Sequence, residues 1–248
     1  MSGHSKWASI KHKKAAVDAK RGKIFTKIIR EITVAAKIGG GDPNTNPRLR
    51  TAIESAKTAN MPADNIDRAV KKGSGELEGV SYEEIFYEGY GPGGVAIYVQ
   101  CLSDNKNRTS SEIRTAFSRK NGNMAGAGSV SWLFEKKGLI AIDVNVIKED
   151  QLMEIALNAG AEDLSNTGEK YEIVTDPHNF EVVKKALDEV KVKYELAALQ
   201  MLPKNLVAVS SDQARQVAAL IEALDDHDDV QNVYTNCDFP PDVLKELQ

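Results

Sequence analysis

The sequence has few of the features that mark secreted, membrane or disulfide-stabilised proteins. It contains two cysteines, Cys101 and Cys237, which are too few and too far apart for a disulfide framework. We expect both to be buried free thiols. No apolar run approaches the roughly 18–20 residues that a membrane span needs. The first residues also lack an apolar segment followed by a cleavage site, so we expect no signal peptide, a cytoplasmic location and no membrane partner.

Motifs that carry catalysis are also missing. The chain has no GxSxG, HExxH, Walker loop or CxxC. His4, His12 and His178 show no metal-ligand spacing. A carboxylate-based nuclease can lack a short motif, so a metal-dependent hydrolase stays a minor alternative. We therefore predict a protein that is not an enzyme and has no cofactor, metal or small-molecule substrate.

Charge is present in ordinary amount but is unevenly distributed. The whole chain of 248 residues has a formal net charge of -4. Residues 1–75 contain 16 Lys+Arg and 6 Asp+Glu, a net charge of +10, and residues 76–248 carry the remaining net charge of −14. This asymmetry predicts an electrostatic partner for one part of the molecule.

The basic charge is densest in KWASIKHKKAAVDAKRGK, residues 6–23, where Asp18 is the one acidic residue. Such cations neutralise phosphates and release counterions, which favours binding to any nucleic acid. Trp7 and His12 could stack on exposed bases. A basic arm can also dock on acidic surface of its own protein, and that alternative stays open. The candidate nucleic-acid contacts are Lys6, Trp7, Lys11, His12, Lys13, Lys14, Lys20, Arg21, Lys23, Lys27 and Arg30.

The N-terminal region reads as helical. Residues 23–38 place apolar side chains on one face and Lys23, Lys27, Arg30 and Lys37 on the opposite face, within about 80°. Glycines and a proline then end the helix, and Asn46-Pro47 predicts the cap and first turn of a second helix. A third helix is expected after Met61-Pro62, ending at Gly73. We predict a domain of residues 1–76, made of the basic arm and three helices.

Later segments read as strands and helices. EIFYEGY and GVAIYVQCL read as two strands, Thr109 and Glu112 as a capping box that opens a helix, and SVSWLF as a further strand. From residue 138 the order is βαββαβ, a split βαβ arrangement. Residues 206–236 then read as strand, helix and strand, a unit too small to fold alone. We expect it to complete the middle domain.

These patterns predict an α+β protein. The N-terminal three-helix domain is followed by two α+β domains of split βαβ (ferredoxin-like) character. The middle one is discontinuous and comprises residues 80–134 plus 203–248. The inserted βαββαβ domain comprises residues 135–202.

Three motifs resemble functional sites without meeting their requirements. GYGPGG at residues 89–94 matches GxGxxG, but a β-like segment follows it instead of a helix, so a hairpin turn is expected. SDNKNRT at residues 103–109 reads as a turn and cap, with Arg108 as a secondary anion contact. LDDHDDV at residues 224–230 places acidic residues around His227 at a helix end, where they are electrostatically unfavourable. A metal site, a solvated acidic cap, and a contact with a basic partner or the basic arm stay open for this Asp225–Asp229 cluster.

Several separate motifs agree, in order, with one known family. They include GHSKWASIKHKKAAVDAKRGKIFTKIIREI, YEGYGPGG, CLSDNKNRT and DDVQNVYTN. Together they resemble the YebC family, whose mitochondrial relatives include the translational activator of cytochrome c oxidase. The resemblance runs from the first residues to about residue 240. It implies three domains, a helical one and two α+β ones, with the middle domain closed by the C-terminal unit.

The resemblance also implies a role in gene expression. Bacterial members are commonly described as DNA-binding transcriptional regulators. Others look like ribosome-associated translation factors that contact RNA, including ones that help synthesis through proline-rich stretches. We predict a non-enzymatic nucleic-acid-binding regulator, with DNA-dependent transcription control as the first hypothesis and a ribosome partner as the alternative.

Overall fold

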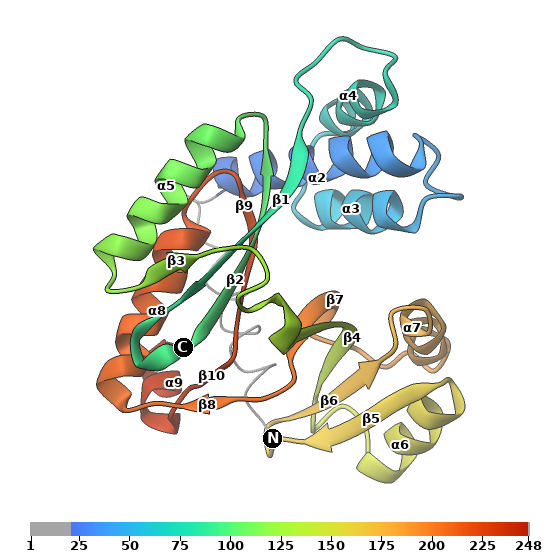
Figure 1. Cartoon of the computed structure of the whole chain (residues 1–248). Coiled ribbons are helices and arrows are strands. Elements are labelled where there is room, and N and C mark those ends of the chain that lie inside the picture. Colours follow the sequence, from blue (N-terminus) through green and yellow to red (C-terminus); the bar gives the residue numbers. More distant parts are fainter. Residues whose placement is uncertain (1–20, 248) are drawn as a thin grey trace. The chain divides into compact units, whose positions relative to one another are not determined.

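The structure is a computed structural model that describes residues 21–247 (Figure 1). The described residues fall into two compact units. One comprises residues 21–131 and 212–235, and the other comprises residues 132–211 and 236–247. The predicted fold class, an α+β protein that begins with helices and continues with β-containing regions, is confirmed. The sequence suggested three domains, whereas the described residues form two compact units. The predicted domain boundaries therefore stay a prediction.

The first unit begins with three helices, α2 (Arg21–Gly39), α3 (Pro47–Thr58) and α4 (Ala63–Ser74). Their apolar faces meet in one core, so the amphipathic pattern of the sequence is realised by packing among the helices. All three predicted helices are present. The buried core residues are Ile32, Ala35, Ala36, Leu49, Ala52, Ala56, Met61, Ile66 and Ala69.

Asn46 fixes the turn between α2 and α3. Its Oδ1 accepts a hydrogen bond from the backbone N–H of Leu49 at 3.1 Å, which is an N-cap contact. Its Nδ2 donates to the carbonyl of Ala35 at 2.8 Å. A Cβ on Gly39 would lie 2.7 Å from the Asn46 side chain, so only glycine leaves room for this cap. The predicted N-cap is confirmed.

Gly73 has a different role from the one the sequence suggested. The sequence predicts that Gly73 ends its helix, but α4 continues to Ser74, and Gly75 takes the left-handed cap conformation with φ 85°. A Cβ on Gly73 would lie 2.3 Å from the carbonyl oxygen of Thr33 and 2.7 Å from Cβ of Ala36. Gly73 is therefore where α4 crosses α2 at close range.

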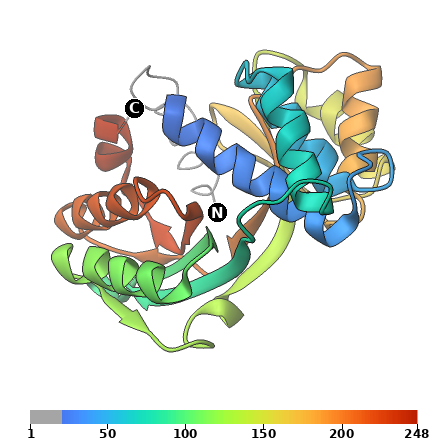
Figure 2. The same ribbon diagram turned by 90° about the horizontal axis from the view of Figure 1, so that it is seen from above.

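The same unit contains a four-stranded antiparallel sheet in the order β3-β1-β2-β9. Two helices, α5 and α8, lie side by side along it (Figures 1 and 2). Phe117 of α5 lies close to Gly89 of β1, and Leu220 of α8 lies close to Gly91. The bounds are β1 (Glu83–Tyr90), β2 (Ala96–Ser103), α5 (Lys106–Arg119), β3 (Asn123–Ala125), α8 (Ser211–Asp225) and β9 (Val230–Thr235).

A tight turn joins β1 to β2 and includes the 3₁₀ segment η2 (Pro92–Gly94). The N–H of Gly91 donates to the carbonyl of Val95 at 2.7 Å, and the two strands pair antiparallel directly around the turn. No helix follows the glycines, so the predicted hairpin turn is confirmed and the dinucleotide motif is not formed.

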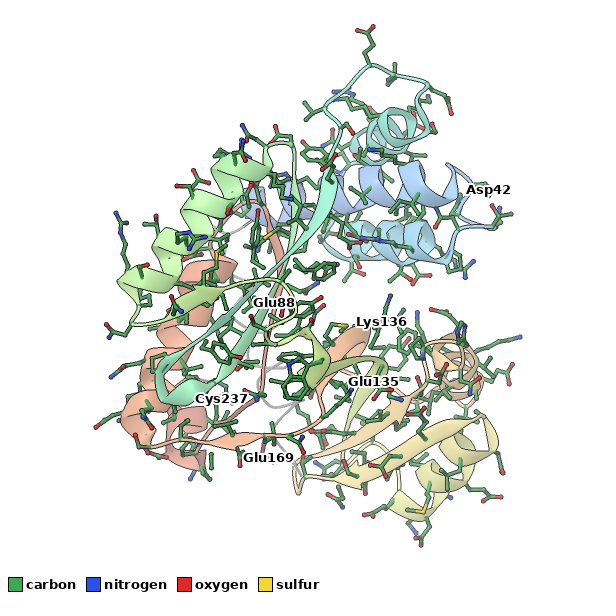
Figure 3. All side chains as sticks on the ribbon, in the orientation of Figure 1. Asp42, Glu88, Glu135, Lys136, Glu169 and Cys237 are labelled. Carbon is green, nitrogen blue, oxygen red and sulfur yellow. The ribbon has the colours of Figure 1, made fainter. Side chains whose placement is uncertain are left out.

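Glu88 of β1, labelled in Figure 3, holds the loop of residues 126–131. Its carboxylate accepts hydrogen bonds from the N–H groups of Gly128, Val130 and Ser131 at 2.6–2.8 Å. Burial alone would raise the pKa of Glu88, but these amide donors outweigh it and lower the pKa.

The strand predicted over SVSWLF is wrong in its first part. Ser131–Leu133 form a 3₁₀ turn, η3, and strand β4 begins at Phe134. The reason is that the N–H groups of residues 130 and 131 donate to Glu88 and not to a neighbouring strand.

The predicted helix cap at Thr109 and Glu112 is also wrong. Helix α5 begins at Lys106, and its N-cap is Asn105, four residues before Thr109; the Asn105 side chain accepts from the N–H of Arg108 at 3.1 Å. Thr109 is completely buried within the helix. Its hydroxyl bonds to Asp229, which lies 120 residues away and is invisible to local sequence reasoning.

The second unit contains the βαββαβ sequence that was predicted. Its sheet has the order β5-β6-β4-β7 with antiparallel pairing, as expected for the split βαβ arrangement. Helices α6 and α7 share a core with Ile140 and Ile142 of β4. The bounds are β4 (Phe134–Asp143), α6 (Glu149–Asn158), β5 (Ala161–Asn166), β6 (Lys170–Thr175), α7 (Phe180–Glu189) and β7 (Leu196–Pro203).

The expectation for residues 206–236 holds in part. Strand β9 pairs with β2 and completes the middle sheet. However, β8 (Val207–Ala208) pairs in parallel with β10 (Cys237–Asp238) as a separate two-stranded sheet. That pair belongs to the second unit, as does the short helix α9 (Pro241–Leu247).

Candidate nucleic-acid interface

The cationic row of α2 contains three of the predicted nucleic-acid contacts, Lys23, Lys27 and Arg30, together with Lys37, which was not among them. We use this term for Lys23, Lys27, Arg30 and Lys37, which the helical period places on one side of α2. The first three of these side chains contact the segment of residues 225–229, where α8 ends. The row is therefore matched over most of its length by an acidic segment of the same unit.

Arg30 makes the most buried of these contacts. Its Nη1 donates to Oδ1 of Asp229 at 2.7 Å, and the side chains of Arg30 and Asp229 are 13% and 2% exposed. The same nitrogen also donates to the backbone carbonyl of Asp228. The guanidinium carbon lies 5.4 Å from the ring centroid of Tyr82, which adds a cation–π contact. Arg30 is thus a structural cation in this state of the protein.

Lys23 and Lys27 contact the end of α8. Lys27 Nζ donates to the carbonyl of Asp225 at 2.7 Å, and Lys23 Nζ donates to the carbonyl of Asp226 at 3.1 Å. The last carbonyls of a helix have no partner within the helix and form the negative end of its dipole. The two lysines supply the missing donors and offset the repulsion that aspartates would otherwise feel there.

Asp229 is the centre of the junction. Its Oδ2 accepts from the Thr109 hydroxyl at 2.6 Å and from Arg108 Nη2 at 2.8 Å. Its backbone carbonyl accepts from the N–H of Leu102 at 2.8 Å. Every polar atom of this buried carboxylate therefore has a described donor.

The pKa of Asp229 reflects opposing effects. Burial raises the pKa because it disfavours the charged form. Hydrogen bonds from Thr109 and Arg108, and the positive charges of both arginines, outweigh burial. The net result is a pKa below the ordinary value for aspartate, so Asp229 is ionised at neutral pH.

Arg108, the predicted secondary anion contact, lies at this junction as well. It pairs with Asp104 at 2.9 Å in addition to Asp229. The hydrogen bond to Asp229 is the main cause of its raised pKa. The anion beside Arg108 in this structure is a carboxylate of the chain itself.

His227 extends the network to α5. Its Nδ1 accepts from the backbone N–H of Asp229 at 3.1 Å, which assigns the proton to Nε2. Nε2 lies 2.7 Å from Oε2 of Glu112 and donates to it. The loop after α8 is thus fixed to α5 on one side and to α2 on the other.

A second ionic contact joins the helices to the sheet. Arg48 of α3 donates to Glu31 of α2 at 2.6 Å and to Glu84 of β1 at 3.0 Å. Burial lowers the pKa of Arg48, but the bonds and charges of the two glutamates raise it further, so the net shift is upward. The sequence offered no local sign of this bridge.

The predicted contacts fall into two groups. Lys23, Lys27, Arg30 and Arg108 are brought together around residues 225–229. Of the alternatives left open for the Asp225–Asp229 cluster, the structure shows contact with basic residues, which are those of α2. Arg21 is the first residue of α2, and its side chain lies outside the described part of the chain. Lys6, Trp7, Lys11, His12, Lys13, Lys14 and Lys20 lie outside the described residues.

Sequence reasoning missed Asp229 as the central residue. The available signal was the cluster of acidic residues at a helix end, which is unfavourable unless cations approach it. The identity of those cations depends on a contact across about 200 residues of chain, which a local pattern does not contain.

Within residues 21–247, no group of three His, Cys, Asp or Glu side chains is placed to hold a metal ion. No helix in that range is long and apolar enough to cross a membrane.

The fold and this junction define a class: α+β proteins in which an N-terminal helical region joins a β-sheet region through buried ion pairs. Comparison with known proteins gives the family. The family model for the TACO1/YebC protein N-terminal domain matches residues 5–76, and that for the TACO1/YebC second and third domain matches residues 82–237. The chain belongs to the TACO1/YebC family, and the resemblance drawn from its motifs is confirmed.

Relatives match over the full length. A protein of Desulfatibacillum aliphaticivorans is 56% identical over 246 residues, covering 99% of this chain and 100% of the relative. A protein of Geobacter sulfurreducens is 56% identical over 247 residues, covering 100% of both. Both are named probable transcriptional regulatory proteins. A crystal structure of a conserved hypothetical protein from Aquifex aeolicus matches with a TM-score of 0.82 and 48% identity, covering 91% of this chain and 93% of that one.

Proposed function

We propose that this protein is a cytoplasmic nucleic-acid-binding regulator of gene expression that acts on DNA to control transcription. The observation that carries the proposal is the charge asymmetry, with a net +10 over residues 1–75 and a net −14 over the rest of a chain whose total is -4. A polyanion is attracted to the stretch of chain with net positive charge and repelled by the stretch with net negative charge. The names of the relatives support transcription as the level of action.

The contacts within the described residues determine how much each predicted residue can contribute to nucleic-acid binding. Arg30 and Arg108 are committed to Asp229, so they contribute little free charge to a nucleic acid. Lys23 is about half exposed and bound mainly through a backbone carbonyl, so it can exchange that partner for a phosphate at small cost. Most of the contact is assigned to the cations of residues 6–21. Because such contacts are to phosphates, they position the protein without specifying sequence.

Charge reversal of the basic segment tests this proposal. A variant with Lys11, Lys13, Lys14 and Arg21 changed to Glu is titrated with a labelled promoter duplex and with a duplex of random sequence. Binding should fall by at least about a hundredfold, and the slope of log K against log[salt] should become shallower by about four. Unchanged affinity for both duplexes would end the proposal.

A matched control reverses four lysines of the second unit. They are Lys136, Lys148, Lys191 and Lys193, all of which are exposed. This control alters the net charge by the same amount and should weaken binding far less. Equal losses in the two variants would show that total charge, and not the basic segment, governs binding.

The acidic remainder of the chain favours a second candidate, a ribosome-associated translation factor. Residues 76–248, with a net charge of −14, repel bare DNA but can face basic ribosomal proteins while the cationic N-terminal residues contact RNA. Crosslinking in cells, followed by sequencing of the recovered nucleic acid, separates the two levels. If ribosomal RNA is recovered without promoter DNA and the protein co-sediments with ribosomes, the proposed role in transcription is wrong and a role in translation takes its place.

A further inference from the structure

Lys37 differs from the other members of the cationic row. Its Nζ lies 2.7 Å from the hydroxyl of Ser81, and its side chain is exposed. Among the described residues, no ion pair joins Lys37 to a carboxylate, whereas Arg30 is paired with Asp229. The end of the row beyond Arg30 therefore carries a positive charge that no carboxylate within residues 21–247 matches.

Lys37 lies on the wall of a cavity. The cavity has a volume of about 550 Å³, within the range of roughly 300–1,000 Å³ that is typical of ligand sites. It is open to solvent and is bordered by α2, by the end of α4 and by the segment of residues 75–82 that leads into β1. Its polar and charged lining comprises Thr33, Lys37, Lys72, Glu78, Ser81 and Tyr82.

The close crossing at Gly73 explains why two lysines share this cavity. Because Gly73 has no side chain, α4 approaches the backbone of α2 at Thr33 and Ala36. Lys37 directly follows Ala36 and Lys72 directly precedes Gly73, and both lysines line the cavity beside this crossing. The stem of Lys72 packs on Gly79, where an added Cβ would lie 3.0 Å from Cδ of the lysine. No described carboxylate forms an ion pair with Lys72 either.

We propose that this cavity binds a phosphate group of a nucleic-acid backbone. This inference rests on the proposed function and locates a contact for it within the described residues. Lys37 and Lys72 supply the positive charge, and the hydroxyl of Ser81, already within hydrogen-bond distance of Lys37, supplies a neutral donor. A phosphate replaces a hydroxyl as the partner of Lys37, so binding does not require an internal ion pair to break.

Glu78 opposes the anion. Its carboxylate lines the same cavity, and the end of α4 presents the negative end of a helix dipole there. The two lysines outnumber this one carboxylate, so the site attracts a phosphate, and Glu78 lowers its affinity for the anion. We therefore expect Glu78→Gln to strengthen nucleic-acid binding and Lys37→Ala and Lys72→Ala to weaken it.

The first experiment measures binding of the full chain to a short labelled DNA duplex and to RNA of the same sequence. The Lys37→Ala/Lys72→Ala variant should bind roughly tenfold more weakly, with a salt slope shallower by about one. The matched control is Lys57→Ala/Arg68→Ala, which removes the same charge from exposed positions on α3 and α4 outside the cavity. It should lose less than about threefold. Circular dichroism confirms that both variants are folded.

The second experiment uses inorganic pyrophosphate and NMR. Titration should shift the backbone amides of Gly79 and Ser81 in the native protein and leave them unmoved in the Lys37→Ala/Lys72→Ala variant. If the native protein binds nucleic acid but the cavity variant binds as well as its control, this inference is overturned and the proposed function stands. If the protein binds no nucleic acid while pyrophosphate shifts these amides, the proposed function fails and an anion site remains. Absence of both signals ends both.

Discussion

Arg30 and Asp229 are separated by 199 positions in the chain, yet Nη1 of the arginine donates to Oδ1 of the aspartate at 2.7 Å. This pair joins the first described helix to the loop before the last strand of the middle sheet. Both side chains are largely removed from water, and the aspartate is also held by Arg108 and Thr109. The position of the helices on the sheet therefore depends on a compensated buried charge.

Removing that charge should be costly. Asp229→Asn leaves two arginines beside a neutral group, and breaking a buried ion pair by removing one partner typically costs about 3–5 kcal/mol. We expect a loss of unfolding free energy of that size by urea denaturation. Asp226→Asn is the control, because Asp226 is 55% exposed and its side chain lies 3.7 Å from Lys23. That change should cost less than about 1 kcal/mol. Equal losses would show that the junction adds no stability.

The same carboxylate predicts a dependence on pH. Its pKa is lower in the folded protein than in the unfolded chain, where aspartate titrates near about 4. The stability it supplies is therefore present above about pH 4 and is lost as the pH falls through the folded value. The difference in stability between native protein and Asp229→Asn should be large at pH 7 and should shrink at about pH 3. A constant difference across this range would contradict the ionised state assigned to Asp229.

Two glycines of the helical region should respond to alanine in opposite directions. At Gly73 an added methyl would lie 2.3 Å from the Thr33 carbonyl, so we expect a loss of about 1–3 kcal/mol from overpacking. At Gly22, also in a helix, nothing lies within 4 Å, and alanine should stabilise by up to about 1 kcal/mol. Thermal unfolding measures both. A neutral Gly73→Ala would mean that α4 can move away from α2 without loss.

Glu88 should control the loop of residues 126–131. Glu88→Gln replaces one acceptor oxygen by a donor that faces backbone N–H groups, so at least one of the three amide bonds is lost. Hydrogen exchange at Gly128, Val130 and Ser131 should accelerate by about tenfold or more. Glu83→Gln, an exposed change on the same strand, should leave these amides unaffected. Unchanged exchange in Glu88→Gln would contradict the role of this carboxylate.

Most elements could be predicted because their signals are local. The period of α2, the cap at Asn46 and the glycines around Pro92 each act within a few residues, and the structure has a helix, an N-cap and a hairpin turn at those places. The predictions are wrong where a residue distant in sequence forms the hydrogen bond that was expected from a local partner. Thr109 bonds to Asp229 within α5 instead of capping it, and Glu88 holds N–H groups that were expected in a strand.

The candidate site shows the same division. Charge counting identified the basic residues of α2 and the anomaly of the acidic residues after α8. It left open whether the two would meet. Lys27 pairs with a carbonyl at the end of a helix, and Arg30 pairs with a buried aspartate. Both contacts join residues about 200 positions apart, so only the tertiary structure shows them.

The sequence by itself determined the α+β class and the separation of charge between the two parts of the chain, because both follow from composition and short-range pattern, and its motifs carried the resemblance to the family. The tertiary structure decided which of those charges are already matched, since Coulomb energy depends on distance and burial, which a linear order of residues does not specify. It thereby turned three predicted contacts, Lys23, Lys27 and Arg30, into partners of residues 225–229, and left Lys37 and Lys72 at a cavity where the sequence had indicated no site.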